Sequence, residues 1–129
     1  MTSGELARGP YSSYVSALVN AVAIAAEEKL GVETVILDLR ELIDAFDAIV
    51  VTSGSNDRQV RALAQEIERC VELSLDVKPI RVEGFFEGEW GALDYGDVIV
   101  HVFEDAAREY YDLEHLWNAA PSLRPQPAR

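Results

Sequence analysis

Apolar residues recur with a helical period in two parts of this chain. The first part begins at Ser13 and carries an apolar residue at every third or fourth position until Gly31, a residue type that commonly follows a helix. The second begins after Asn56 and runs to about Leu73. Asn56 is followed by Gln59 at the spacing of a capping box, which closes a helix N-terminus. The pattern therefore predicts two amphipathic helices, each with one buried stripe.

Between and after these helices, short runs rich in β-branched residues predict five strands. A turn or short helical piece around 41–46 separates the first two strands, and a turn at Tyr95-Gly96 joins the last two as a hairpin. The second strand is almost wholly apolar, so we expect it at the centre of a sheet, covered on both faces. The five expected strands are Thr34–Leu39, Ala48–Thr52, Pro79–Glu83, one that starts at Trp90, and Val98–Phe103.

This order of elements predicts an α/β fold in which a mixed five-stranded sheet is flanked by helices, because strand–helix–strand connections precede a terminal hairpin. A last helical segment is expected over 108–117. We expect a flexible N-terminus at 1–12, a single domain at 13–120 and a disordered tail at 121–129. The tail contains three prolines and no apolar pattern.

The net charge of −12 disfavours some classes of binding partner. Nucleic-acid binding depends largely on Lys and Arg that neutralise phosphates, and anionic membranes attract the same residues, so both partners are disfavoured. Ten carboxylates and a single cation, Arg108, lie between residues 83 and 114, and both tryptophans fall within 90–117. This combination favours a surface for a basic partner. A surface charge that only keeps the protein soluble would explain the net charge of −12 equally well.

A single cysteine, Cys70, excludes an internal disulfide and is typical of a reducing compartment. It lies in a helical pattern, where we expect a small half-buried filler and not a reactive thiol. The N-terminus lacks the pattern of a signal peptide, and no stretch approaches the ~18–20 uninterrupted apolar residues of a membrane-spanning helix. We therefore expect a cytoplasmic protein.

The Gly54-Ser55 loop lies between a buried strand and a helix N-terminus, where backbone amides can bind an anion. The glycines of a Walker loop or of a dinucleotide-binding fingerprint are missing. A nucleotidyltransferase shares this order of elements but needs carboxylates on neighbouring strands to hold Mg²⁺, and Arg81 stands where one of them is required. A tight turn with a good helix cap is the favoured interpretation. A nucleotide-binding or nucleotidyl-transferring enzyme is the rival one.

The aspartates and histidines that could take part in catalysis or metal binding are better explained by structural roles. Asp94 and Asp97 flank the hairpin turn, where aspartates commonly accept hydrogen bonds from turn amides. His101 shares a strand face with apolar residues, which favours a partly buried histidine over a metal ligand. His115 lies in the last helical segment, and with one cysteine no zinc-like cluster is predicted. We therefore expect no catalytic residues, no metal and no cofactor.

Two tryptophans and one cation complete the candidate surface. Trp117 continues the apolar stripe of the last helical segment, so we expect it to anchor that segment on the sheet as a core residue. Trp90 opens a strand beside a polar loop, where packing and partner contact are equally well supported. Arg108 is expected to pair with Glu104 or Asp112, each about one turn away.

Four strings in this sequence resemble the ribosomal silencing factor family, also called the Iojap family. They are SGSNDRQV at 53–60, Glu83-Gly84 followed by Trp90, LDYGDVIVHVF at 93–103 and REYYDLEHLW at 108–117. The resemblance covers about 15–120, nearly the whole expected domain, and the last two strings are long and specific. The sequence departs from the family pattern at Ala48-Ile49, where tyrosine and phenylalanine are frequent, and at Gly91-Ala92, where bulkier aliphatic residues stand.

The resemblance implies a nucleotidyltransferase-like topology without that activity and without its catalytic carboxylates. It also implies binding to the large ribosomal subunit through its basic ribosomal protein number fourteen (uL14). Binding at that site blocks the small subunit from joining and represses translation. If the departing positions touch the partner, docking differs in detail; if they are in the core, their neighbours must repack.

Charge, aromatic content and the resemblance together indicate one contact surface on the sheet edge and the C-terminal segment. His101 and Trp117 are expected to support that surface from beneath. A homodimerisation module that pairs through an apolar edge, including Phe85 and Phe86, is a further alternative. We expect the following residues to contact the ribosomal protein, with little direct contact to nucleic acid: Trp90, Leu93, Asp94, Tyr95, Asp97, Arg108 and Tyr110.

Overall fold

The computed structural model describes residues 11–42, 44–85, 89–105 and 122–123. Within them, the two helices and five strands expected from the sequence are confirmed, and the strand ends differ from the expected ones by no more than two residues. The elements, in chain order, are α1 (Ser13–Glu28), β1 (Val32–Asp38), β2 (Ala48–Gly54), α2 (Asp57–Leu75), β3 (Arg81–Gly84), β4 (Trp90–Asp94), β5 (Val98–Glu104) and β6 (Ser122–Leu123).

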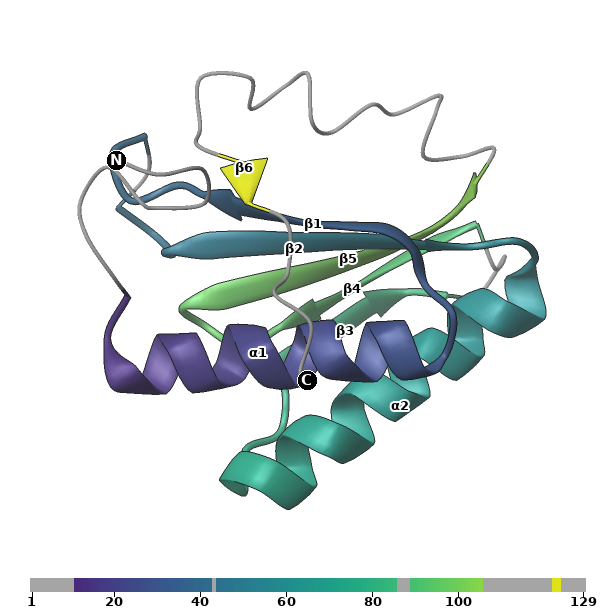
Figure 1. Ribbon diagram of the computed structural model, residues 1–129, viewed down its shortest axis with the longest axis horizontal. Helices are drawn as coiled ribbons and strands as arrows, with labels where there is room; N and C mark the ends of the chain where they lie inside the picture. The colour runs from purple at the N-terminus through teal and green to yellow at the C-terminus, as the bar shows by residue number, and fades with distance from the viewer. Residues whose placement is uncertain (1–10, 43, 86–88, 106–121, 124–129) are drawn as a thin grey trace.

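The strands form one mixed sheet with the order β3-β4-β5-β2-β1-β6. β2 and β5 run parallel, and the other neighbouring strands run antiparallel. All seven residues of β2 are buried, as its apolar sequence predicts. Both helices lie on one face of the sheet (Figure 1). Neither of these two described helices combines the length and the apolar character needed to cross a membrane.

Each face of the sheet buries its own apolar layer, because successive strand residues point to opposite faces. The layer under the helices joins α1 and α2 to alternate strand residues, among them Ile36, Val50 and Val100. The side chains of the opposite layer are at most 6% exposed, although the described part of the chain places no helix over them. This second layer consists of Val35, Leu37, Leu39, Ile49, Val51 and Phe103.

Local contacts set both ends of α1. The hydroxyl of Ser12 accepts a hydrogen bond from the N–H of Val15 at 3.2 Å, which caps the N-terminus. At the other end, the residue in the left-handed conformation is Leu30 (φ 60°), and not the Gly31 that the sequence suggests. Glycine at 31 meets a different requirement, because a Cβ at this position would collide with the hydroxyl of Thr52.

A buried ion pair lies at the end of β1. Asp38 is 3% exposed, and its carboxylate accepts hydrogen bonds from Arg40 Nε at 2.9 Å and Nη2 at 3.0 Å. The guanidinium carbon of Arg40 also lies 4.4 Å from the centroid of the Tyr11 ring. Tyr11 is thereby tied to the domain, whereas the sequence predicts a flexible N-terminus through residue 12. That prediction is wrong at Tyr11, because its anchor is 29 positions away in the sequence.

β6 is a strand that the sequence does not predict. Ser122 and Leu123 pair antiparallel with Leu37 and Ile36 on the outer edge of β1. The expectation of disorder over 121–129 is therefore wrong at these two positions. Backbone hydrogen bonds to an open strand edge need no apolar pattern, so a strand this short leaves no signal in the sequence.

Candidate binding surface

The hairpin of β4 and β5 brings three rings together on the face of the sheet opposite the helices. Trp90 lies opposite Phe103 and Ala92 lies opposite His101 in the register, so these side chains share one face. The indole N–H of Trp90 donates to His101 Nδ1 at 3.0 Å. The His101 ring stacks on Trp90 and on Phe103, with ring centroids 5.9 and 6.0 Å apart. Trp90 is thus held by its neighbours while part of its side chain stays exposed.

His101 is a partly buried structural histidine, as its strand position predicts. Because Nδ1 accepts the indole hydrogen bond, the ring is in its neutral form. Burial lowers the pKa of His101 from its ordinary value of 6.5 to about 4. A ring that is neutral at physiological pH packs beside both Trp90 and Phe103 and adds no positive charge to this face.

The burial of His101 predicts a pH-dependent stability. The unfolded chain takes up a proton near pH 6.5 and the folded protein only near pH 4, so the unfolded state binds more protons between these values. The free energy of unfolding should therefore fall by up to about 3 kcal/mol as the pH is lowered through this window. Urea unfolding at a series of pH values measures the loss. His101→Gln keeps an acceptor for Trp90 and should remove this part of the profile; an unchanged profile would contradict the assignment.

Hydrogen bonds fix the turn between β4 and β5. The carboxylate of Asp94 accepts from the N–H of Gly96 at 2.8 Å, so the predicted turn-amide role is confirmed for this aspartate. Gly96 has φ 89°, which glycine adopts without strain. The backbone carbonyl of Asp97 accepts from the N–H groups of Asp47 and Ala48 at 2.7 and 3.3 Å, which ties the turn to the start of β2. The side chain of Asp97 is exposed.

Two of the expected contact residues lie in the core. Leu93 is fully buried and Tyr95 is 4% exposed, and both belong to the layer under the helices. Burial, together with the negative charges of glutamates on α2, raises the pKa of the Tyr95 phenol. Their expected contact with a partner is therefore corrected to a supporting role. Alternation along β4 turns Leu93 toward the helices and away from the face that carries Trp90 and Asp94.

Trp90, Asp94 and Asp97 keep exposed or half-exposed side chains on or beside the β4–β5 hairpin. Asp94 lies opposite Ile99 in the register, so the half-buried Ile99 joins Trp90 and Asp94 on one face. We call Trp90, Asp94, Asp97 and Ile99 the hairpin surface. The sequence analysis did not include Ile99 in the candidate surface. Its alternation with His101 along β5 is the signal that would have found it.

Several predicted residues lie outside the described part of the chain. They are Phe86, Arg108, Tyr110, His115 and Trp117. The expected partner contacts of Arg108 and Tyr110, and the expected core position of Trp117, stay predictions.

Phe85, named above as part of an apolar edge for homodimerisation, is half-buried and packs against the layer under the helices. The ring occupies the space that a Cβ at Gly91 would need. All four positions at which the sequence departs from the family pattern, Ala48-Ile49 and Gly91-Ala92, are buried. The departures therefore change the core and not the hairpin surface, and at Gly91 the Phe85 ring fills the volume left by the missing side chain.

The Gly54-Ser55 loop is a capped helix start in which both donors of Ser55 bond to a side chain of the same helix. The N–H and the hydroxyl of Ser55 both donate to Gln59 Oε1, at 2.7 and 2.8 Å. Gln59 N–H donates to the side chain of Asn56 at 2.9 Å, which confirms the predicted cap, and the Gln59 amide nitrogen donates to two carbonyls at the end of α1. The turn-and-cap interpretation is confirmed, because the Ser55 amide that would face a phosphate is engaged within the protein.

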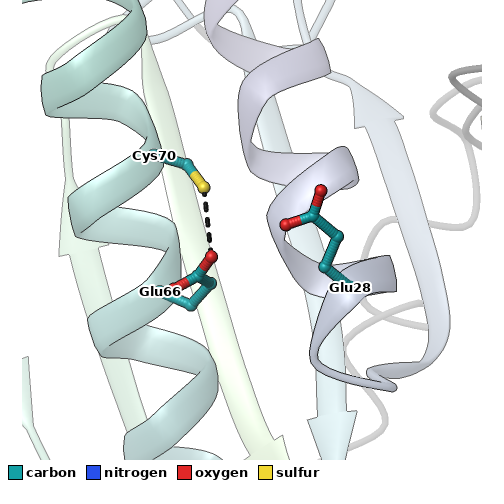
Figure 2. A group of neighbouring side chains, drawn as sticks. All are labelled: Glu28, Glu66 and Cys70. Carbon is teal, nitrogen blue, oxygen red and sulfur yellow. Dashed lines mark hydrogen bonds between the residues drawn. The ribbon is translucent and has the colours of Figure 1, made fainter.

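A cluster of two carboxylates and a thiol lies between the helices. Glu66 and Cys70 on α2 face Glu28 on α1 (Figure 2). Arg69 bonds to the Glu66 carboxylate at 2.7 and 3.0 Å and lowers its pKa to about 2. The Cys70 thiol donates to the same carboxylate at 3.4 Å, and burial raises the pKa of that thiol. The cluster is explained as polar packing between helices, and Cys70 is the half-buried filler that its position predicts.

Both the sequence and the fold match known proteins. A family model described as "Ribosomal silencing factor during starvation" matches residues 12–129. The chain is 37% identical over 105 residues to the ribosomal silencing factor RsfS of Bacillus subtilis, covering 81% of this chain and 87% of that protein. It is 39% identical over 101 residues to RsfS of Chromobacterium violaceum, covering 77% and 81%. A crystal structure of a protein from Chromobacterium violaceum matches with a TM-score of 0.71 at 33% identity, covering 89% of each chain. This chain therefore belongs to the ribosomal silencing factor family.

Proposed function

We propose that this protein represses translation by binding the large ribosomal subunit through its basic ribosomal protein number fourteen (uL14), so that the small subunit cannot join. The observation that supports the proposal most is the hairpin surface, which presents a fixed indole beside two aspartates in a chain of this family. In this proposal the protein acts in the cytoplasm as a steric block and performs no chemistry.

Charge and aromatic content have separate roles in this proposal. The chain carries a net charge of −12, and Asp94 and Asp97 place part of it on the hairpin surface. Complementary charges raise the rate of encounter with a basic partner, whereas a buried aromatic anchor slows dissociation. Trp90 suits the second role, because its ring is already held by His101 and loses little freedom on binding.

The rigidity of the hairpin also supports a steric role. The turn is held from within by the bond between Asp94 and Gly96, and from outside by two bonds to the carbonyl of Asp97. A surface that is fixed before binding spends little free energy on ordering. A rigid domain on the large subunit can exclude a second large particle by its volume alone.

The rival enzyme function has no comparable support. The N–H and the hydroxyl of Ser55 in the Gly54-Ser55 loop both bond to Gln59. The curated relatives carry the name of ribosomal silencing factors, which describes a regulatory activity. Micromolar binding of ATP with Mg²⁺, measured by calorimetry, would be the result that revives this rival.

Asp97→Lys should slow association with isolated large subunits by roughly threefold or more at low salt and leave dissociation nearly unchanged. Asp97 is the suitable position because its side chain is exposed, whereas the Asp94 carboxylate also holds the N–H of Gly96. Raised salt should slow wild-type association in the same way, because it screens the attraction. Surface plasmon resonance with immobilised protein resolves the two rate constants.

Glu28→Lys is the matched control for this experiment. It changes the net charge by the same amount at an exposed position at the end of α1, on the helix side of the sheet. We expect it to slow association clearly less than Asp97→Lys does. Equal slowing would assign the effect to total charge, and association that responds to neither the variants nor the salt would contradict the electrostatic part of the proposal.

A further inference from the structure

β3 lies beside β4 at one end of the sheet, and its side chains divide between the two faces. In the register, Arg81 lies opposite Asp94. Two positions later, Glu83 lies opposite Ala92. Paired residues of neighbouring strands share a face, so Arg81 and Glu83 lie on the face that carries the hairpin surface, whereas Val82 between them lies on the helix face. β3 therefore adds one cation and one carboxylate beside the hairpin surface.

Glu83 is a diagonal neighbour of Trp90. It lies opposite Ala92, which follows Trp90 by two positions along β4, and diagonal neighbours on one face are within reach of long side chains. The Trp90 side chain is partly exposed, and its ring is held by His101. Among aromatic side chains, tryptophan attracts cations most strongly. A basic side chain of a partner that reaches the Glu83 carboxylate can therefore also lie against the indole.

Within the chain, Arg81 is the cation that contacts this carboxylate. Arg81 Nη1 and Glu83 Oε1 are 3.7 Å apart, which is longer than the about 2.7–2.9 Å of a close charge-assisted hydrogen bond. The two side chains are 62% and 56% exposed, and such an exposed pair contributes little to stability. A cation from outside the chain can therefore replace Arg81 on Glu83 at a small cost in free energy.

We propose that Glu83 binds a basic side chain of the partner, which takes the place of Arg81 on the carboxylate and lies against Trp90. Arg81 then opposes binding in two ways, because its contact with Glu83 must break and its charge repels the incoming cation. The two charges of β3 thus have opposite effects on the complex. This inference rests on the proposed function, in which the partner is a basic ribosomal protein of the large subunit.

Equilibrium binding of the full chain to purified large subunits, at one fixed salt concentration, tests the inference. Glu83→Gln keeps the size of the side chain and removes its charge, so it should weaken binding roughly fivefold or more. Arg81→Ala should strengthen binding roughly two- to fivefold, because it removes the competing cation. Both positions are exposed, so both variants should keep the fold, which circular dichroism and thermal unfolding check.

The double variant separates competition for Glu83 from an effect of total charge. If Arg81 acts through Glu83, then Arg81→Ala should lose most of its strengthening effect when it is combined with Glu83→Gln.

Lys78→Ala and Glu72→Gln are the matched controls. Lys78 and Glu72 also form an exposed pair at 3.7 Å, and Glu72 lies on α2, on the helix side of the sheet. Each control changes the net charge by the same amount as its counterpart on β3. Both should change binding clearly less than Arg81→Ala and Glu83→Gln do.

The outcomes distinguish this inference from the proposed function. If the wild type binds large subunits and Glu83→Gln binds equally well, the inference is overturned and the proposed function stands. The same holds if Arg81→Ala strengthens binding by the same factor with and without the Glu83 charge, or if the controls have effects as large as those of the β3 variants. A wild type that does not bind large subunits would overturn the proposed function and this inference with it.

Discussion

Asp38→Ala is expected to lower the free energy of unfolding by about 3 kcal/mol. The variant takes away the carboxylate that accepts two hydrogen bonds from the Arg40 guanidinium, whose side chain is only 12% exposed. Removing one partner of a buried ion pair costs far more than the pair contributes in total, because the remaining charge stays out of water. Urea unfolding followed by circular dichroism at neutral pH measures the difference.

The double variant Asp38→Ala with Arg40→Leu separates the buried charge from other causes. It removes the guanidinium as well as the carboxylate, so it should be more stable than Asp38→Ala alone. If Asp38→Ala lowers the free energy of unfolding by less than about 1 kcal/mol, the ion pair of Asp38 and Arg40 behaves as a solvent-exposed one. A double variant that is no more stable than the single one would assign the loss to packing at Asp38.

Trp90→Ala is expected to weaken binding to the large ribosomal subunit by roughly 30-fold or more, which corresponds to about 2 kcal/mol. The indole is the one large aromatic side chain of the hairpin surface, and in the proposed function it is the anchor that slows dissociation. Trp90→Phe keeps a ring and loses only the N–H, which bonds to His101 within the domain. This second variant should retain most of the binding while losing about 1 kcal/mol of stability. Equilibrium binding to purified large subunits measures both variants.

Loss of stability must be distinguished from loss of contact at Trp90. Asp38→Ala is a suitable control, because it should destabilise the fold comparably from β1, three strands away from β4 in the sheet. At temperatures where it is folded, it should bind the large subunit as the wild type does. Normal binding by Trp90→Ala, or an equal loss in Asp38→Ala, would contradict the anchor role of Trp90.

The features that sequence reasoning predicts well are those set by neighbours in the chain. The cap at Asn56 and the turn contact of Asp94 each join residues within three positions of one another. Burial of β2 follows from its own apolar run. His101 was expected to be partly buried because it alternates with apolar residues along one strand face. In each case the pattern and the contact lie in the same short segment.

The features that sequence reasoning misses depend on residues that are far apart or on the exact register. Tyr95 lies at a turn and is among the expected contact residues, but its ring packs in the layer under the helices. The ring of Phe85 lies over Gly91 only because the chain reverses between β3 and β4. The contact between Tyr11 and Arg40 has no local pattern at all. Such contacts require the three-dimensional arrangement of the strands.

In the proposed function this protein keeps the two ribosomal subunits apart. The most direct test mixes the purified protein with separated subunits and follows all three components through a sucrose gradient. The protein should travel with the large subunit and not with the small one, and its addition before mixing should reduce the yield of whole ribosomes in proportion to the amount bound. A large subunit that fails to retain the protein, while the two subunits join as freely as they do without it, would contradict the claim.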